Sequence, residues 1–167
     1  MLKMPVMKKL FALLLLFLFI FGGYRVYTKY FADNSANLVT RSTIQIGETR
    51  YTVEVVDSDD KRALGLSGRE SLLPEHGMLF LFDVKDTYAF WMKDMKFPID
   101  IVWIDENIIA DIYENVPVPL ANVNLPRYQA HKPVNKVLEV NAGEVKNHGF
   151  KIGDVVQITL LNSAKKR

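Results

Sequence analysis

Acidic, basic and aromatic side chains gather in one short stretch of the chain, FWMKDMKFPID, which spans residues 90–100. A carboxylate such as Asp94 or Asp100 can act as an acid or a base, and Lys93 can stabilise negative charge. The ring of Trp91 can stack on a sugar or another planar ligand, and Arg69 adds a second cation that can orient it. The predicted ligand-binding residues are therefore Trp91, Lys93, Asp94, Asp100 and Arg69, and no residue is assigned a catalytic role.

Asp100 admits two interpretations. If residues 97–104 are extended, the alternation of side chains directs Asp100 into an apolar layer, where an unpaired carboxylate costs several kcal/mol. In the structural interpretation, which we favour, Asp100 accepts backbone N–H groups of the 93–96 turn or pairs with Arg62 or Arg69. In the functional interpretation it lines a ligand pocket.

Motifs that would specify a reaction or a metal ion are incomplete. The segment GLSGR, residues 65–69, has an arginine where a nucleophile elbow needs its last glycine. The segment DSDDKR, residues 57–62, has lysine and arginine where an EF-hand loop needs a ligand and a glycine, so helix capping explains it better. The three histidines are far apart in sequence. We therefore expect no metal and no cofactor.

Two classes of function remain compatible with these residues. The first, which we favour, is a non-enzymatic binding module for a small molecule, a glycan or a protein, acting through the turn at residues 91–96 and a proline-rich loop at 115–133. The second is a hydrolase-like enzyme with Asp100 or Asp94 as acid or base and Arg69 or Lys93 for electrostatic stabilisation.

Charge and cysteine content exclude several classes of partner and chemistry. The chain has 21 basic and 19 acidic residues, and residues 1–37 contain five of the basic ones and one of the acidic ones. The remainder, 16 basic and 18 acidic residues, is close to neutral, so we expect no nucleic-acid partner. Because the chain has no cysteine, it can form no disulfide, thiol nucleophile or thiolate metal site.

The amino-terminal region is typical of a membrane-targeting segment. Lys8 and Lys9 precede LFALLLLFLFIFGG, residues 10–23, which contains no charged residue. The small-residue pattern for cleavage is poor, so we favour a retained anchor that binds the membrane, with secretion after cleavage as the alternative. The lysines before the apolar run place the domain outside the cytoplasm, so an envelope protein is a possible partner.

The rest of the chain predicts short strands separated by glycine and proline turns. A hairpin is expected at 43–56, a short helix at 57–66 and a helical turn at 143–148; further strands are expected at 77–83, 88–92, 97–105, 108–113, 136–140 and 155–161. This pattern predicts a mainly β (α+β) fold, with a small antiparallel or mixed sheet curled into a partial barrel, one or two short helices and an N-terminal hydrophobic helix. The expected organisation is a signal-anchor at 1–31, a linker at 32–42, the domain at 43–161 and a basic tail at 162–167.

Three ordered segments, RALGLSGRESLLPEHGMLFLFD, FWMKDMKFPIDIVWID and VLEVNAGEVKNHGFKIGD, resemble the prokaryotic DUF192 family. The resemblance covers residues 43–161 and implies a small, mainly β domain, often preceded by a signal or anchor, with no assigned activity. It departs from the family at Asp94 and Met95, where the family usually has Asn-Thr. The positions that the resemblance marks as structural are Arg62, Gly65, Gly77, Met78, Phe90, Met92, Pro98, Glu139, Gly143 and Gly153.

Overall fold

The computed structural model describes residues 42–120 and 125–161. The N-terminal hydrophobic helix, the signal-anchor, the linker up to residue 41 and the basic tail, all expected from the sequence, lie outside these residues. Among the helices of the described ranges, none is long and apolar enough to cross a membrane.

Strands dominate the described domain. They are β1 (Thr43–Ile46), β2 (Thr49–Val56), β3 (His76–Asp86), β4 (Ala89–Phe90), β5 (Ile99–Asp105), β6 (Ile108–Val116), β7 (Tyr128–Gln129), β8 (Val134–Asn141) and β9 (Val156–Thr159). Two short helices, α2 (Asp59–Leu64) and α3 (Glu144–His148), complete it. The expected mainly β domain with one or two short helices is confirmed.

Seven strands form one mixed sheet in the order β6-β5-β8-β3-β2-β1-β9, and β4 pairs with β7 in a separate two-stranded sheet. β2 and β3 are parallel, with α2 in the connection between them, and the other neighbours in the large sheet are antiparallel. β8 comes late in the chain but lies inside the sheet, where it pairs with both β3 and β5.

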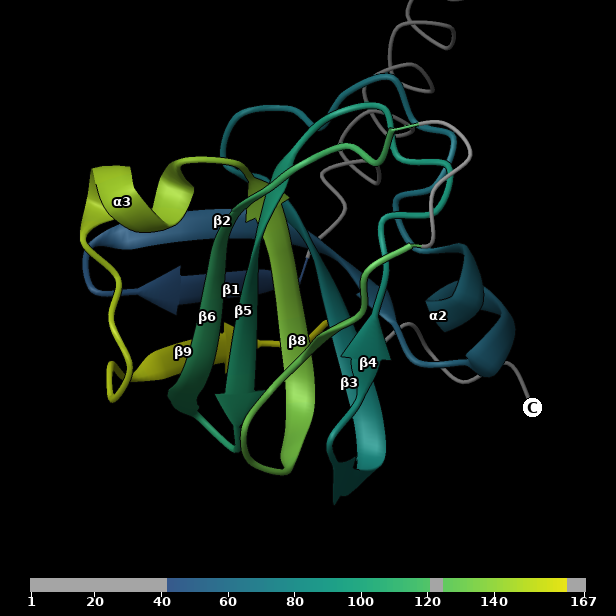
Figure 1. Ribbon diagram of the computed structural model, residues 1–167. Coiled ribbons are helices and arrows are strands. Elements are labelled where there is room, and N and C mark those ends of the chain that lie inside the picture. The colour runs from purple at the N-terminus through teal and green to yellow at the C-terminus, as the bar shows by residue number, and fades with distance from the viewer. Residues whose placement is uncertain (1–41, 121–124, 162–167) are drawn as a thin grey trace, which may run out of the picture. The chain divides into compact units, whose positions relative to one another are not determined.

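The large sheet curls so that its two edges meet at one end. β1, β2 and β9 cross the direction of β5, β6 and β8 (Figure 1). Edge strand β6 forms an isolated bridge from Ile108 to Val155, just before the opposite edge strand, β9. Beside it, Ile109 N–H donates to the Asp154 carbonyl at 3.0 Å. The expected partial barrel is thus a half-barrel closed at one end.

Each face of the sheet is covered by its own hydrophobic cluster. The inner cluster lies between the two halves of the curled sheet and includes Tyr51 of β2, Val102 of β5 and Val145 of α3. The outer cluster includes Ile101 and Trp103 of β5. Neighbouring residues of β5 therefore alternate between two cores, as expected from strand geometry.

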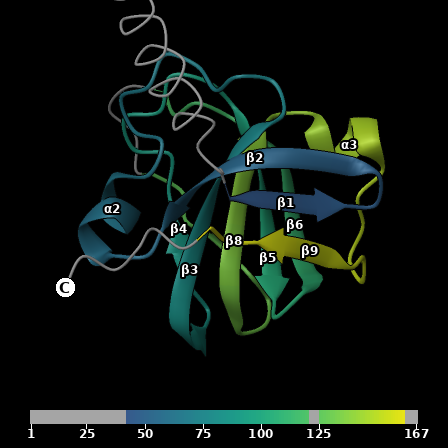
Figure 2. The same cartoon turned by 180° about the vertical axis from the view of Figure 1, so that it is seen from behind.

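The outer cluster is covered by α2, by the β4–β7 pair and by the segment between β4 and β5. Figures 1 and 2 show α2 beside β4 and β3 from opposite sides. Leu66, which follows α2, and Met92 and Met95, which follow β4, are buried against the outer face of the sheet. These three segments form the walls of the cavity described below.

Candidate functional site

A cavity of ≈ 220 Å³ lies between α2, β3, β4 and the turn at residues 91–95. Its lining is mostly apolar, and five of the lining residues are aromatic: Phe80, Phe82, Tyr88, Phe90 and Trp91. Cavities of this kind, with a few polar groups among apolar walls, are the usual form of small-molecule sites.

Contacts between the rings hold the aromatic wall in place. Phe80 and Phe90 meet edge to face, with ring centroids 4.8 Å apart, and Phe82 stacks on Tyr88 at 3.6 Å. β4 pairs with β7 through Phe90 and Tyr128, which fixes the backbone that carries this wall. The cavity is therefore built from side chains that already have packing partners.

Helix α2 is fastened to the wall by Arg62. Its Nη1 donates to the Leu81 carbonyl at 2.7 Å, its Nη2 pairs with Asp59 at 2.6 Å, and its guanidinium lies 5.1 Å from the centroid of the Phe82 ring. The helix ends at Gly65, whose φ of 51° is in the left-handed region that favours glycine. A Cβ at this position would lie 3.5 Å from the ring of Phe80, in ordinary contact.

The segment after α2 is tied to the turn at 91–95 through backbone groups. Ser67 Oγ donates to the Lys93 carbonyl at 2.8 Å, and Gly68 N–H donates to the Asp94 carbonyl at 2.8 Å. Asp94 itself has a φ of 56°. These bonds place two walls of the cavity at a fixed separation.

Glu139 is the acidic residue of the cavity. It lies on the inner strand β8, opposite Met78 of β3 and Ile101 of β5, and is only 6% exposed. Its Oε2 atom is buried and has no hydrogen-bond partner among the described residues. Burial raises the pKa of Glu139 to about 8, although the positive charge of Arg69 acts in the opposite direction.

Three other polar side chains of the cavity are already engaged. Ser67 and Arg62 make the bonds given above, and the Tyr88 hydroxyl donates to the Val84 carbonyl at 2.6 Å. Among the charged and hydroxyl-bearing side chains that line the cavity in the described residues, the carboxyl of Glu139 is thus the one with a buried oxygen that lacks a partner.

The structure brings one of the predicted binding residues, Trp91, to this cavity. Trp91 is 48% exposed, and the guanidinium of Arg127 lies 5.7 Å from its ring centroid. The side chains of Lys93 and Asp94 are exposed and do not line the cavity. Arg69 pairs with Glu54 at 2.7 Å.

Asp100 lies on the other face of the sheet. It is fully buried; Oδ1 accepts the Asn115 N–H at 2.7 Å and Oδ2 accepts the Val145 N–H at 2.9 Å. Its partners are therefore backbone amides, but not those of the 93–96 turn, and neither Arg62 nor Arg69. The reason is that β5 directs Asp100 towards the inner cluster, whereas the turn covers the outer one.

Glu139 was assigned only a structural position from the sequence. The signal that could have found it is an acidic residue within the apolar strand VLEV, residues 137–140. In an extended strand, Glu139 shares a face with Val137, which belongs to the outer cluster. Strand alternation therefore directs the Glu139 carboxyl into an apolar layer, as it does that of Asp100.

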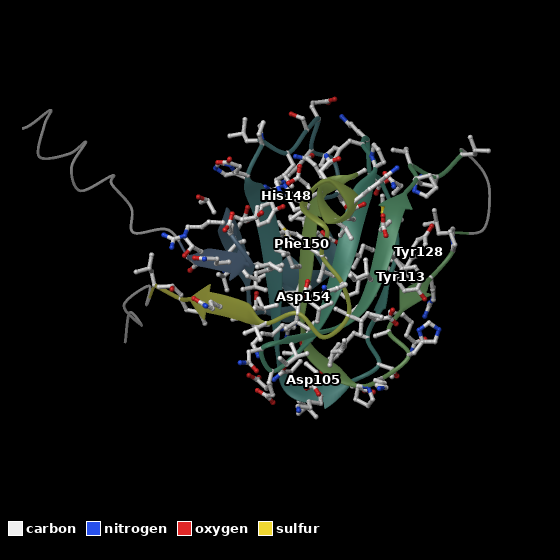
Figure 3. The ribbon with its side chains drawn as sticks, turned by 90° about the vertical axis from the view of Figure 1, so that its left-hand side faces the viewer. Asp105, Tyr113, Tyr128, His148, Phe150 and Asp154 are labelled. Carbon is white, nitrogen blue, oxygen red and sulfur yellow. The ribbon has the colours of Figure 1, made fainter. Side chains whose placement is uncertain are left out.

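Histidines pair with carboxylates elsewhere in the domain. His131 Nδ1 lies 2.6 Å from Asp111, and His148 Nε2 lies 3.4 Å from Glu144. His148 also stacks on Phe150 with ring centroids 5.7 Å apart, and Figure 3 shows both near α3. Within residues 42–120 and 125–161, no group of three or more acidic or histidine side chains is placed to hold a metal ion.

Two solved structures resemble the described domain. A protein from Sinorhizobium meliloti 1021, described as a "putative transcription regulator", is 33% identical, with a TM-score of 0.63, over 71% of this chain and 92% of its own. A protein of unknown function from Novosphingobium aromaticivorans DSM 12444 is 29% identical, with a TM-score of 0.62, over 70% of this chain and 83% of its own.

Sequence comparison gives the family and no activity. No curated protein matches the chain. Residues 42–158 match DUF192, described as "Uncharacterized ACR, COG1430", which confirms the resemblance seen in the sequence. The chain belongs to the DUF192 family.

Proposed function

We propose that this domain is a non-enzymatic binding module that takes a small organic molecule into the cavity between α2, β3 and β4. The observation that carries this proposal is the carboxyl of Glu139, buried in an aromatic cavity with no partner for Oε2 in the described part of the chain. An unsatisfied buried polar group costs the fold about 1–3 kcal/mol. A ligand that hydrogen-bonds to it would offset that cost.

The volume of the cavity limits the ligand. At ≈ 220 Å³ it is smaller than the ~300–1,000 Å³ of sites for drug-sized molecules. A glycan or a protein partner would insert one sugar or one side chain, with Trp91 at the rim as a stacking surface.

An acid–base enzyme acting through Glu139 is the second candidate. A carboxyl whose pKa is about 8 is suited to proton transfer near neutral pH. Such chemistry usually needs a second group to complete the transfer, and Arg62, Ser67 and Tyr88 are engaged in the contacts described above. Asp94 and Asp100, the acids expected from the sequence, do not line the cavity. Binding is therefore the better supported function.

We also propose that the module is anchored at the outer side of a membrane by the apolar run at residues 10–23. The full chain should then stay with the membrane fraction after an alkaline wash, and a variant with two charges introduced into that run should not. Recovery of a shortened protein in the soluble fraction would instead indicate a cleaved signal peptide.

Ligand-observed NMR tests the binding function directly. A set of fragments of positive, neutral and negative charge is screened against three full-length proteins: wild type, Ala63→Trp and the matched control Ala63→Ser. Ala63 is exposed and lines the cavity, so tryptophan there should fill the space without disturbing the core. Fragments should bind wild type and Ala63→Ser but not Ala63→Trp. Equal binding to all three, or binding to none, would refute the proposal.

A further inference from the structure

The nature of the ligand follows from the groups around Glu139, and this step depends on the proposed function. We infer that the cavity binds an organic cation, a protonated amine on a small apolar body, and that its binding ionises Glu139. In this exchange the carboxyl loses its proton to solvent, the carboxylate and the ammonium form an ion pair, and the ammonium keeps its own protons.

An ammonium group matches the hydrogen-bonding capacity of the Glu139 carboxyl. Oε2 of Glu139 is buried and has no partner within residues 42–120 and 125–161. The side chains of its cross-strand neighbours, Met78 and Ile101, are apolar and can donate no hydrogen bond. An ammonium group offers up to three donors in a compact volume, and a bond between charged groups is about twice as strong as one between neutral groups. An amine therefore supplies what the cavity lacks.

The charges around Glu139 also favour a cationic ligand. The charged groups that face Glu139 are Arg62 on α2 and Arg69 in the segment after it, whereas β3, β5 and the 91–95 turn present Met78, Ile101 and Met95. Arg62 pairs with Asp59, and Arg69 pairs with Glu54. Both arginines are thus already paired with another carboxylate, and a cation in the cavity would give an ionised Glu139 a counter-ion of its own.

The aromatic walls of the cavity favour a cation as well. The face of an aromatic ring carries negative electrostatic potential and attracts cations. Two of the lining rings already do so, because Arg62 lies over Phe82 and Arg127 lies over Trp91. A wall of this kind favours a cationic ligand over an anionic one of the same size.

Because Glu139 is buried, binding of a cationic ligand can be measured by the proton that its carboxyl releases. Since its pKa is about 8 in the empty cavity, the carboxyl is mostly protonated at neutral pH and below. Pairing with a cation lowers that pKa, so a proton must leave as the cation binds. The release should approach one proton per ligand at about pH 6.5 and should decline above about pH 8.

Isothermal titration calorimetry in two buffers of different ionisation enthalpy measures that release. The probes are 2-phenylethylamine, 2-phenylethanol and phenylacetate, which present a cation, a neutral group and an anion on similar apolar bodies. The full-length protein should bind the amine at least roughly tenfold more tightly than the alcohol, with close to one proton released. Glu139→Gln should lose both the preference and the release. Glu114→Gln, a change at an exposed residue, should keep both.

The outcomes separate this inference from the proposed function. Tighter binding of the alcohol or the acid would leave a binding module but overturn the cationic ligand, with Glu139 then a neutral hydrogen-bond donor or a bystander. If the amine binds without proton release, or if Glu139→Gln binds it with unchanged affinity, the ion pair is overturned. If none of the three probes binds, the inference of a cationic ligand is overturned. The proposed binding function is refuted only if, in addition, no fragment of the wider set shows binding that Ala63→Trp abolishes.

Discussion

Asp100 and Glu139, two of the three buried carboxylates in the described part of the sheet, have opposite surroundings. Asp100 accepts two backbone N–H groups, one for each oxygen, and so satisfies its own charge within the fold. Glu139 has an oxygen with no partner among the residues that the structure describes, which raises the free energy of its charged form. At the residue scale, Asp100 is therefore a structural group and Glu139 is the candidate for function.

Replacing Asp100 tests its structural role. Asp100→Asn removes one of the two acceptors, because an amide NH₂ would face a backbone N–H, so one buried donor is left unpaired. We expect the free energy of unfolding to fall by about 1–3 kcal/mol in urea denaturation. Asp94→Asn, at an exposed residue, is the control and should change it little. Equal stability of the two variants would contradict the structural role of Asp100.

Glu139 should make stability depend on pH. Because its pKa is raised from 4.5 to about 8 in the folded protein, the folded state binds more protons than the unfolded state between these values. The free energy of unfolding should therefore fall as pH rises through this range, and level off above it. In Glu139→Gln this fall should largely disappear, and the variant should be more stable than wild type at about pH 9. Thermal unfolding between pH 5 and about 9 measures this, and parallel curves for both proteins would count against it.

At the scale of elements, α2 depends on one side chain for its position. Arg62 is held to the Leu81 carbonyl of β3, whereas its neighbour Lys61 makes only an exposed pair with Asp57 at 3.8 Å. Arg62→Ala should destabilise the domain by about 1–3 kcal/mol and loosen the cavity, while Lys61→Ala should cost less than about 1 kcal/mol. Amide hydrogen exchange of residues 59–68 is the measurement. Similar protection of α2 in both variants would mean that packing alone holds it.

Local elements could be predicted from the sequence, but their pairing could not. The hairpin of β1 and β2 around Gly47 is confirmed, because short-range alternation and turn chemistry determine it. The strand expected at 88–92 is only Ala89–Phe90, since the chain turns at once, with Met95 N–H donating to the Met92 carbonyl. β7, within the proline-rich loop, was not expected.

The site was missed for the same reason. Periodicity correctly assigned β5 side chains to two faces, yet nothing local shows that β8 comes between β3 and β5. That order brings Glu139 under α2 and leaves Asp100 near α3. The order of the strands in the sheet, a long-range property, therefore determines which acidic residue lies beside the aromatic wall.

At the scale of the whole domain, the strands of the curled sheet contribute side chains to both hydrophobic clusters. Successive residues of β5 enter different cores, Val102 the inner one and Trp103 the outer one, so neither core can melt while the other keeps that strand in place. The contacts between β6 and the residues before β9 add a closure that joins the two ends of the strand order. We therefore predict that the domain unfolds as a single cooperative unit.

Two probes on opposite faces test that cooperativity. Trp103 fluorescence reports on the outer cluster, with Trp91→Phe introduced to remove the exposed second tryptophan. A fluorinated tyrosine at Tyr51, observed by ¹⁹F NMR, reports on the inner one. Because every strand of the large sheet lies within residues 42–161, this segment expressed alone should give coincident urea transitions for the two probes. If the Trp103 probe reports unfolding of the outer cluster while the Tyr51 probe still reports a native inner cluster, the outer cluster with its cavity unfolds separately. The pH dependence due to Glu139 should then appear in that first transition alone.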